Sequence, residues 1–302
     1  MIPYHQFGPW HLGPFTVYPF GILVGMAILV GTWIAQNRAE QLGLNPKAFS
    51  ELIIWLFIGG FTMAHVVSVV FYFPDRIKEN PLELLMFWRG ISSFGGFFGG
   101  VLAIWIYTKK YKMPIWTTMD ALAWGLSVAW IFGRMGCTVA FDHPGKPTHF
   151  FLAFKNPPYP VPEGYDAIHN LGFYEMLYTV FLAGTLYAVN KWVVDRGKGF
   201  AGLTLGLLAT LYAPVRFGLD FLRIADKHYL GLTPGQYFAF VVLALGLWIL
   251  WYRRRAPDET FPPYNYKTGK GGLLTEQAPQ RKSATASNKS SVTKSSKKVA
   301  KH

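Results

Sequence analysis

The sequence predicts an all-α integral membrane protein, a bundle of about seven transmembrane helices with an external loop or head region between the fourth and fifth spans. Two observations predict this fold. Hydrophobic residues make up 51% of the 302 residues and charged residues only 15%, against roughly a quarter in soluble domains. Apolar stretches of about 20 residues recur along the chain, and a helix needs this length to cross a bilayer.

The apolar stretches are continuous and do not alternate with polar residues, which favours helices over the strands of a barrel. The first stretch follows a segment without Lys or Arg, so we expect a retained span and not a cleaved signal peptide. An odd number of spans puts the two termini on opposite sides of the membrane. The seven stretches cover residues 17–35, 52–73, 91–107, 119–135, 171–194, 200–222 and 236–251.

Basic residues near the span ends predict the orientation through the positive-inside rule. One set of basic residues lies at the ends of the third, fifth and seventh stretches, and these ends share one side of the membrane. The run Arg253 to Arg255 and the basic tail make this side the more positive of the two. That side is expected to be cytoplasmic. The N-terminus and residues 137–170 are then expected to face the outside.

The net charge of +13 is concentrated at the C-terminal end, where residues 253–302 contain 12 Lys/Arg and 3 Asp/Glu. We expect two parts: a transmembrane domain over residues 1–252 and a basic, Ser/Lys-rich, disordered cytoplasmic tail over residues 253–302. Transient docking of the tail on anionic lipid is an open alternative. The balanced charge of the remainder excludes a nucleic-acid-binding surface. The single cysteine, Cys137, excludes an intrachain disulfide and a Cys-based zinc site, and no metal cofactor is expected.

Ionisable residues within apolar stretches are the candidates for function, since an unpaired charge there costs on the order of 3 kcal/mol. Arg134 lies between Gly133 and Gly136, and glycines let a ligand approach the backbone closely. Helical spacing puts a second set on one face: Arg216, Asp220 and Arg223. Glu175 and Tyr174 follow His169 at the start of the fifth stretch. Together these residues predict an anion pocket in the outer half of the membrane, because arginine binds phosphate with two parallel hydrogen bonds. Mutual pairing of the charges is the structural alternative.

Other polar positions carry weaker signals. Gly95 and Gly96 lie in a glycine-rich stretch that indicates either close helix packing or a groove for a lipid head group. His65 is expected to be a core histidine or a binding residue. Cys137 is expected to be an inert buried thiol, and Asp120 and Gln236 are expected to cap helices. His143 and His149, with Asp142, are not expected to bind zinc.

These motifs resemble those of the prolipoprotein diacylglyceryl transferase family, from about residue 18 to residue 255. The strongest likeness is Gly133-Arg134-Met135-Gly136-Cys137, followed by Asp142 and by Gly145-Lys146-Pro147-Thr148. Tyr174-Glu175 is similar to the family's Gln-Leu-Tyr-Glu stretch. The segment from Arg216 to Arg223 is similar to its Arg-x-x-x-Glu-x-x-Arg segment, and Pro234-Gly235-Gln236 is similar to its Met-Gly-Gln segment.

The sequence also departs from the family pattern. Ser93-Phe94-Gly95-Gly96 lacks the family's histidine of Ser-Phe-His-Gly-Gly, and His65 stands where the family has arginine. Asp142 and Asp220 replace glutamates. The family's His-Pro-Ser-Gln stretch is His169-Asn170-Leu171-Gly172 here.

The resemblance implies an enzyme of the bacterial inner membrane that transfers the diacylglyceryl group of phosphatidylglycerol to the lipobox cysteine of a preprolipoprotein, releasing glycerol 1-phosphate. The proton acceptor is left open among Asp142, Glu175, His65 and His169. Two alternatives remain: a divergent paralogue that only binds signal peptides or anionic lipid, and a lipid or anion transporter. The implied catalytic residues are Arg134, Arg216, Asp142, Glu175 and Asp220. The implied substrate-binding residues are Arg223, Tyr174, Tyr18, Gly95, Gly96, Gly133, Gly136, His65 and His169.

Overall fold

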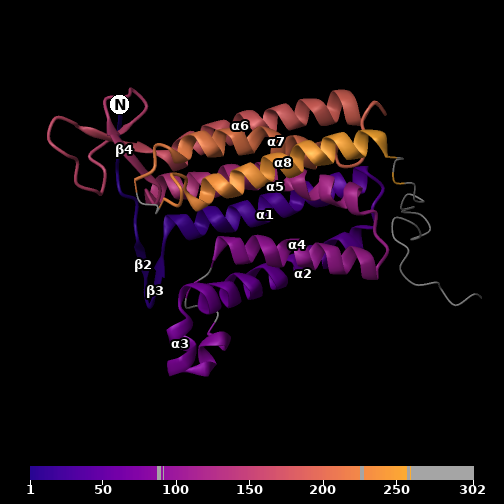
Figure 1. Ribbon diagram of the computed structural model, residues 1–302, viewed down its shortest axis with the longest axis horizontal. Coiled ribbons are helices and arrows are strands. Elements are labelled where there is room, and N and C mark those ends of the chain that lie inside the picture. The colour runs from indigo at the N-terminus through magenta and orange to yellow at the C-terminus, as the bar shows by residue number, and fades with distance from the viewer. Residues whose placement is uncertain (87–89, 91, 225–227, 257–258, 260–302) are drawn as a thin grey trace, which may run out of the picture.

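A computed structural model describes the chain except for residues 87–89, 91, 225–227, 257–258 and 260–302, so most of the predicted tail lies outside the described residues. Long helices run side by side along one axis, and a small β-rich region lies beside the N-terminus at one end (Figure 1). The C-terminal end of the last helix lies at the opposite end of the bundle (Figure 1).

The long helices begin and end close to the predicted apolar stretches. Their bounds are α1 Pro19–Gln41, α2 Pro46–Val67, α4 Ser93–Lys110, α5 Ile115–Ala140, α6 Leu171–Val189, α7 Leu203–Asp220 and α8 Pro234–Arg255. Short π-helical turns, Ser68–Tyr72 and Asn190–Val194, extend α2 and α6. The segment between α2 and α4 contains a short helix, α3 Pro74–Glu79, and a 3-10 turn, Pro81–Leu85.

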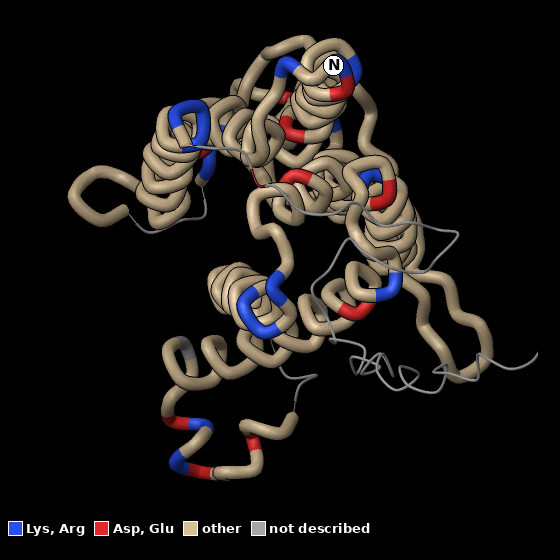
Figure 2. The backbone as a smooth tube through the Cα atoms, turned by 90° about the vertical axis from the view of Figure 1, so that its right-hand side faces the viewer, with Lys and Arg blue, Asp and Glu red and all other residues tan. Residues whose placement is uncertain are grey.

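Five of these helices are long and apolar enough to cross a membrane: α1, α2, α5, α6 and α8. Helices α4 and α7, of 18 residues each, fall outside this group. Large apolar side chains such as Leu29, Phe71 and Phe240 point outward and are mostly exposed. In a view along the bundle, Lys, Arg, Asp and Glu occupy few positions of the helices, most of which are drawn in tan (Figure 2). The molecule is therefore an all-α membrane protein with an apolar exterior.

Polar side chains define where the helices begin. Asn45, Ser92 and Asn170 accept hydrogen bonds from backbone amides in the first turns of α2, α4 and α6. Thr233 and Gln236 form a capping box at the start of α8. The predicted cap at Gln236 is confirmed.

Glycines allow the helices to approach closely. A Cβ atom on Gly99 of α4 would lie 2.2 Å from the carbonyl oxygen of Gly59 on α2, and one on Gly125 of α5 would lie 2.4 Å from that of Gly31 on α1. Gly95 packs in the same way, since its Cβ would lie 2.4 Å from the oxygen of Met63. Close packing through small residues is a common way of joining membrane helices.

Two small sheets, which the sequence pattern does not predict, lie outside the helices. The chain between α5 and α6 forms β4 Pro144–Thr148, β5 Phe154–Lys155 and β6 Ala167–Asn170. These strands and β1 Ile2–Pro3 form a sheet of order β1-β5-β6-β4, in which only β1 and β5 are parallel. Strands β2 Trp10–Leu12 and β3 Phe15–Val17 form a hairpin before α1.

Asp120 is a buried carboxylate on α5 that binds the start of another helix. It accepts hydrogen bonds from the backbone amides of Gly202, at 2.7 Å, and Leu205, at 2.9 Å, at the start of α7. The sequence predicts a helix cap at Asp120, and the amides that Asp120 binds belong to α7, which is distant from it in the sequence. Asp120 therefore joins α5 to the first turn of α7.

We expect Asp120→Ala to reduce the free energy of unfolding by about 0.5–2 kcal/mol, the usual cost of losing a helix cap. Asp120→Asn keeps one acceptor oxygen and should lose less. Thermal unfolding in detergent micelles measures both. If Asp120→Ala unfolds at the same temperature as the unaltered protein, the hydrogen bonds from Asp120 to the two amides do not stabilise the fold.

Candidate functional site

Five charged side chains from three helix ends meet at the end of the bundle that also contains the β-rich region. We call them the arginine–carboxylate cluster: Arg134, Glu175, Arg216, Asp220 and Arg223. Arg134 lies in the last two turns of α5, Glu175 in the first turns of α6, and Arg216 and Asp220 at the end of α7. The structure thus brings together five charged residues that the sequence predicted, four from the fourth, fifth and sixth apolar stretches and Arg223 from directly after the sixth.

Glu175 connects the two central arginines. Its Oε2 lies 2.7 Å from Nε of Arg134, and its Oε1 lies 3.0 Å from Nη1 of Arg216. The hydroxyl of Tyr212, one helical turn before Arg216, donates to Oε2 at 3.0 Å. The Glu175 side chain is only 1% exposed, whereas each arginine is 15% exposed. The guanidinium groups therefore form the accessible part of the cluster.

Asp220 holds the other side of Arg216. Its Oδ1 lies 2.9 Å from Nη1 of Arg216 and 3.9 Å from Nη1 of Arg223. The hydroxyl of Thr233, the N-cap of α8, donates to Oδ2 of Asp220. The start of α8 thereby holds the carboxylate of Asp220 in place, and this carboxylate in turn positions Arg216.

The cluster carries a surplus positive charge, because three guanidinium groups face two carboxylates. In the described part of the chain, Nε and Nη2 of Arg216 have no hydrogen-bond partner. Guanidinium donors in a poorly solvated site bind phosphate strongly. The cluster is therefore suited to an anion that approaches Arg134 and Arg216 together.

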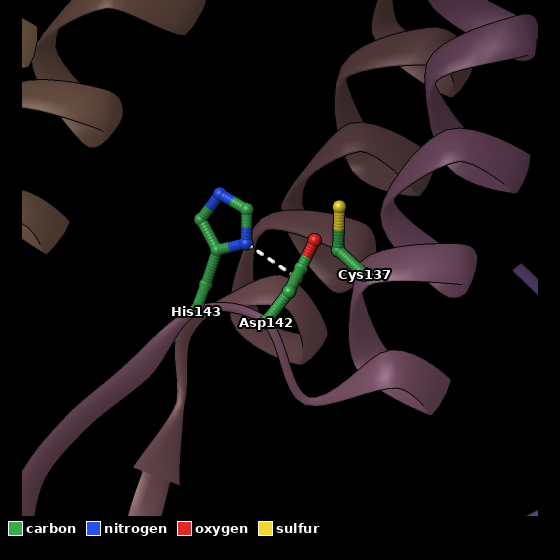
Figure 3. A group of neighbouring side chains, drawn as sticks. All are labelled: Cys137, Asp142 and His143. Atoms are coloured by element: carbon green, nitrogen blue, oxygen red, sulfur yellow. Dashed lines mark hydrogen bonds and ion pairs between the residues drawn. The ribbon is translucent and has the colours of Figure 1, made fainter. Parts of the chain in front are cut away.

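A second polar group adjoins the cluster at the end of α5. Nη1 of Arg134 lies 3.9 Å from Sγ of Cys137. The donor atoms of Cys137, Asp142 and His143 all lie within 4.8 Å of one another (Figure 3). Phe141 has a left-handed backbone with φ of 51° and a fully buried ring, and this turn brings Asp142 and His143 back beside the helix.

Asp142 and His143 contact each other directly. Nδ1 of His143 lies 2.5 Å from Oδ1 of Asp142, which is hydrogen-bond distance. The two residues form a hydrogen-bonded carboxylate–imidazole pair.

His169 and Tyr174 form a separate pair at the start of α6. The hydroxyl of Tyr174 lies 2.8 Å from Nδ1 of His169, and both rings contact Phe150. Burial lowers the pKa of His169 below its ordinary value, which favours the neutral imidazole. His169 therefore adds little positive charge to the arginine–carboxylate cluster.

The remaining predicted binding residues lie in varied surroundings. A Cβ atom on Gly133 would meet nothing within 4 Å, whereas one on Gly136 would lie 3.1 Å from the ring of Phe20 on α1. The Tyr18 side chain is exposed and forms no hydrogen bond to any residue that the structure describes.

Three others lie on α2 and α4. Gly95 packs against α2, as described above, whereas Gly96 lines an apolar groove of about 250 Å³ between α2 and α4. His65 is fully buried, and its ring nitrogens lie 3.1 and 2.9 Å from the carbonyl oxygens of Gly90 and Glu83. Backbone carbonyls thus anchor His65.

Three features of the site are not predicted from the sequence: Tyr212, Thr233 and the contact between Asp142 and His143. Helical spacing could have identified Tyr212, because it lies four residues before Arg216 and therefore on the same face of the helix. The contact of Thr233 with Asp220 depends on how α7 and α8 pack, which no spacing reveals.

The family model described as prolipoprotein diacylglyceryl transferase matches residues 9–252. Relatives named phosphatidylglycerol–prolipoprotein diacylglyceryl transferase occur in Chromohalobacter salexigens, Acinetobacter baumannii and Allorhizobium ampelinum. Each is 28% identical to this chain. The alignments cover 82%, 80% and 85% of this chain and 92%, 90% and 93% of the respective relatives. The matched residues contain the whole arginine–carboxylate cluster, and the chain belongs to the prolipoprotein diacylglyceryl transferase family.

Proposed function

We propose that this protein is a phosphatidylglycerol–prolipoprotein diacylglyceryl transferase. It transfers the diacylglyceryl group of phosphatidylglycerol to the thiol of the lipobox cysteine in a preprolipoprotein, and glycerol 1-phosphate leaves. The convergence of Arg134 and Arg216 on one buried carboxylate, with a surplus positive charge, is the observation that supports this most strongly.

The charge change of the reaction suits this site. The phosphodiester of the lipid carries one negative charge, and the leaving phosphate monoester gains a second as its carbon–oxygen bond breaks. Donors that are already aimed at the developing charge lower the barrier without reorganising. Arg134 and Arg216 are these donors in our proposal, Arg223 adds charge, and Glu175 and Asp220 fix their positions.

Both substrates reach the site from the membrane, because one is a lipid and the other carries an apolar signal peptide. The open space at Gly133 gives the phosphate room beside Arg134. The apolar groove at Gly96 between α2 and α4 fits an acyl chain. Tyr18, Gly95, Gly136, His65, His169 and Tyr174 complete the proposed substrate-binding set.

We place the cluster on the periplasmic side of the bacterial inner membrane. The N-terminus is periplasmic and the C-terminus cytoplasmic in this arrangement, with seven spans and the β-rich region outside. Residues 253–302 form the proposed basic cytoplasmic tail. The run of three arginines at the end of α8 supports this orientation, since positive residues favour the cytoplasmic side.

The direct test is an assay with purified protein, labelled phosphatidylglycerol and a lipobox peptide. We expect a mass increase of one diacylglyceryl group on the cysteine and release of glycerol phosphate. A peptide without added mass would contradict the proposal. If the peptide binds without product, the protein is the divergent binding paralogue, and lipid or anion flux across vesicles without product would indicate a transporter.

Gly235 provides a test of how tightly the site is built. A Cβ atom on this residue would lie 2.7 Å from Oδ2 of Asp220 and 3.2 Å from Nη2 of Arg216. Gly235→Ala should therefore displace both groups, and a displacement of about 1 Å costs about 10²-fold in rate. Gly184→Ala is the matched control, because its Cβ meets nothing within 4 Å. Equal transfer rates in both variants would show that Arg216 needs no fixed position.

A further inference from the structure

We propose that His143, held by Asp142, is the general base that takes the proton from the lipobox thiol. This inference deepens the proposed function and rests on it. The sequence leaves the proton acceptor open among Asp142, Glu175, His65 and His169, and the family's third-span histidine is absent here.

The geometry of the pair is that of an oriented base. The carboxylate of Asp142 binds Nδ1 of His143, and the backbone oxygen of His143 accepts a hydrogen bond from the amide of Leu171 at 3.1 Å. Nε2 has no hydrogen-bond partner among the described residues and lies on the side of the ring away from Asp142 (Figure 3). The side chain is 20% exposed, so a substrate thiol can reach it.

The pair lies next to the phosphate-binding side of the cluster. Nη1 of Arg134 is 3.9 Å from Sγ of Cys137, and that sulfur is within 4.8 Å of the donor atoms of Asp142 and His143. Arg134 and the Asp142–His143 pair therefore both lie beside Cys137, which puts the pair next to the guanidinium group that binds the lipid phosphate in our proposal.

The other candidate bases are already engaged. Both carboxylate oxygens of Glu175 are occupied, because they contact Arg134, Arg216 and the hydroxyl of Tyr212. Both ring nitrogens of His65 lie beside backbone carbonyls. His169 pairs with the neutral hydroxyl of Tyr174 and, among the described residues, has no carboxylate partner to stabilise an imidazolium.

The step balances in atoms and charge. The thiol proton moves to Nε2, the sulfur forms a bond to the terminal glycerol carbon of the diacylglyceryl group, and the bond from that carbon to the phosphate oxygen breaks. Its electron pair stays on the glycerol phosphate, which becomes a dianion. Asp142 stabilises the imidazolium that forms, and the proton then passes to the departing phosphate or to water.

The test compares two acceptor peptides that differ only in having cysteine or selenocysteine in the lipobox. A selenol is ionised at neutral pH and needs no base. We expect His143→Gln to lower the transfer rate to the cysteine peptide by about 10²-fold or more. Its rate with the selenocysteine peptide should stay within a few-fold of the rate of the unaltered protein. Asp142→Asn, which affects the orientation of the imidazole, should show the same selectivity with a smaller loss.

Two variants serve as controls. His149→Gln removes the other histidine of this region that lies beside an aspartate, Asp166, at 3.7 Å, and should leave both rates unchanged. Arg134→Ala should reduce both rates. If His143→Gln lowered the transfer rate equally with both peptides, or did not lower it with the cysteine peptide, the role of His143 would be overturned. The proposed function would still stand. Absence of product from the unaltered protein with both peptides would overturn the proposed function and this inference with it.

Discussion

Arg134→Ala is expected to lower the rate of diacylglyceryl transfer by about 10²–10³-fold, the usual loss when one aligned donor to a developing negative charge is removed. Arg134 also donates to the hydroxyl of Tyr212 at 3.3 Å and contacts Glu175, so its loss affects the positions of neighbouring groups as well. Initial rates with saturating phosphatidylglycerol and lipobox peptide measure the effect.

Two further variants identify which property of Arg134 matters. Arg134→Lys keeps the positive charge but loses the planar fork, and we expect it to recover only a small part of the rate. Arg255→Ala removes an arginine that lies over the ring of Trp251, near the end of α8, and should leave the rate unchanged. Activity of Arg134→Ala near that of the unaltered protein would contradict the proposed role of the guanidinium.

Glu175→Gln is expected to destabilise the protein and to abolish transfer. Glu175 is 1% exposed, and its carboxylate is the partner that Arg134 and Arg216 share. Breaking a buried ion pair by removing one partner costs about 3–5 kcal/mol, because the remaining charge is left buried without compensation. The two guanidinium groups then repel each other and lose the shared partner that positions them for one phosphate.

Thermal unfolding in detergent measures this loss, and the transfer assay measures the activity of the fraction that remains folded. Glu163→Gln removes an exposed carboxylate from the loop between β5 and β6 and is the matched control, with unfolding unchanged. An unfolding temperature of Glu175→Gln equal to that of the control would show that Glu175 does not compensate the two arginines.

The sequence predicted the long helices well, because a bilayer requires continuous apolar stretches whose length is fixed by its thickness. The sequence also predicted which charged residues form the candidate site. Arg134, Glu175 and Arg216 were candidates because each is costly in an apolar stretch, and that cost is lowest when they meet. The structure brings them together around Glu175.

The contacts that depend on packing could not be predicted. The strands of the β-rich region are two to five residues long, too short for a periodic pattern. Asp142 and His143 approach Cys137 only because Phe141 adopts a left-handed backbone, which its sequence neighbours do not indicate. The glycine stretch was ambiguous, since Gly95 packs against a helix while the adjacent Gly96 lines a groove.

A structure of the protein in a lipid nanodisc with bound phosphatidylglycerol tests the central claim most directly. We expect the lipid phosphate within hydrogen-bond distance of both Arg134 and Arg216, with its glycerol carbon facing His143. A phosphate bound elsewhere, with both guanidinium groups contacting only Glu175, Asp220 and Tyr212, would contradict the proposed phosphate site.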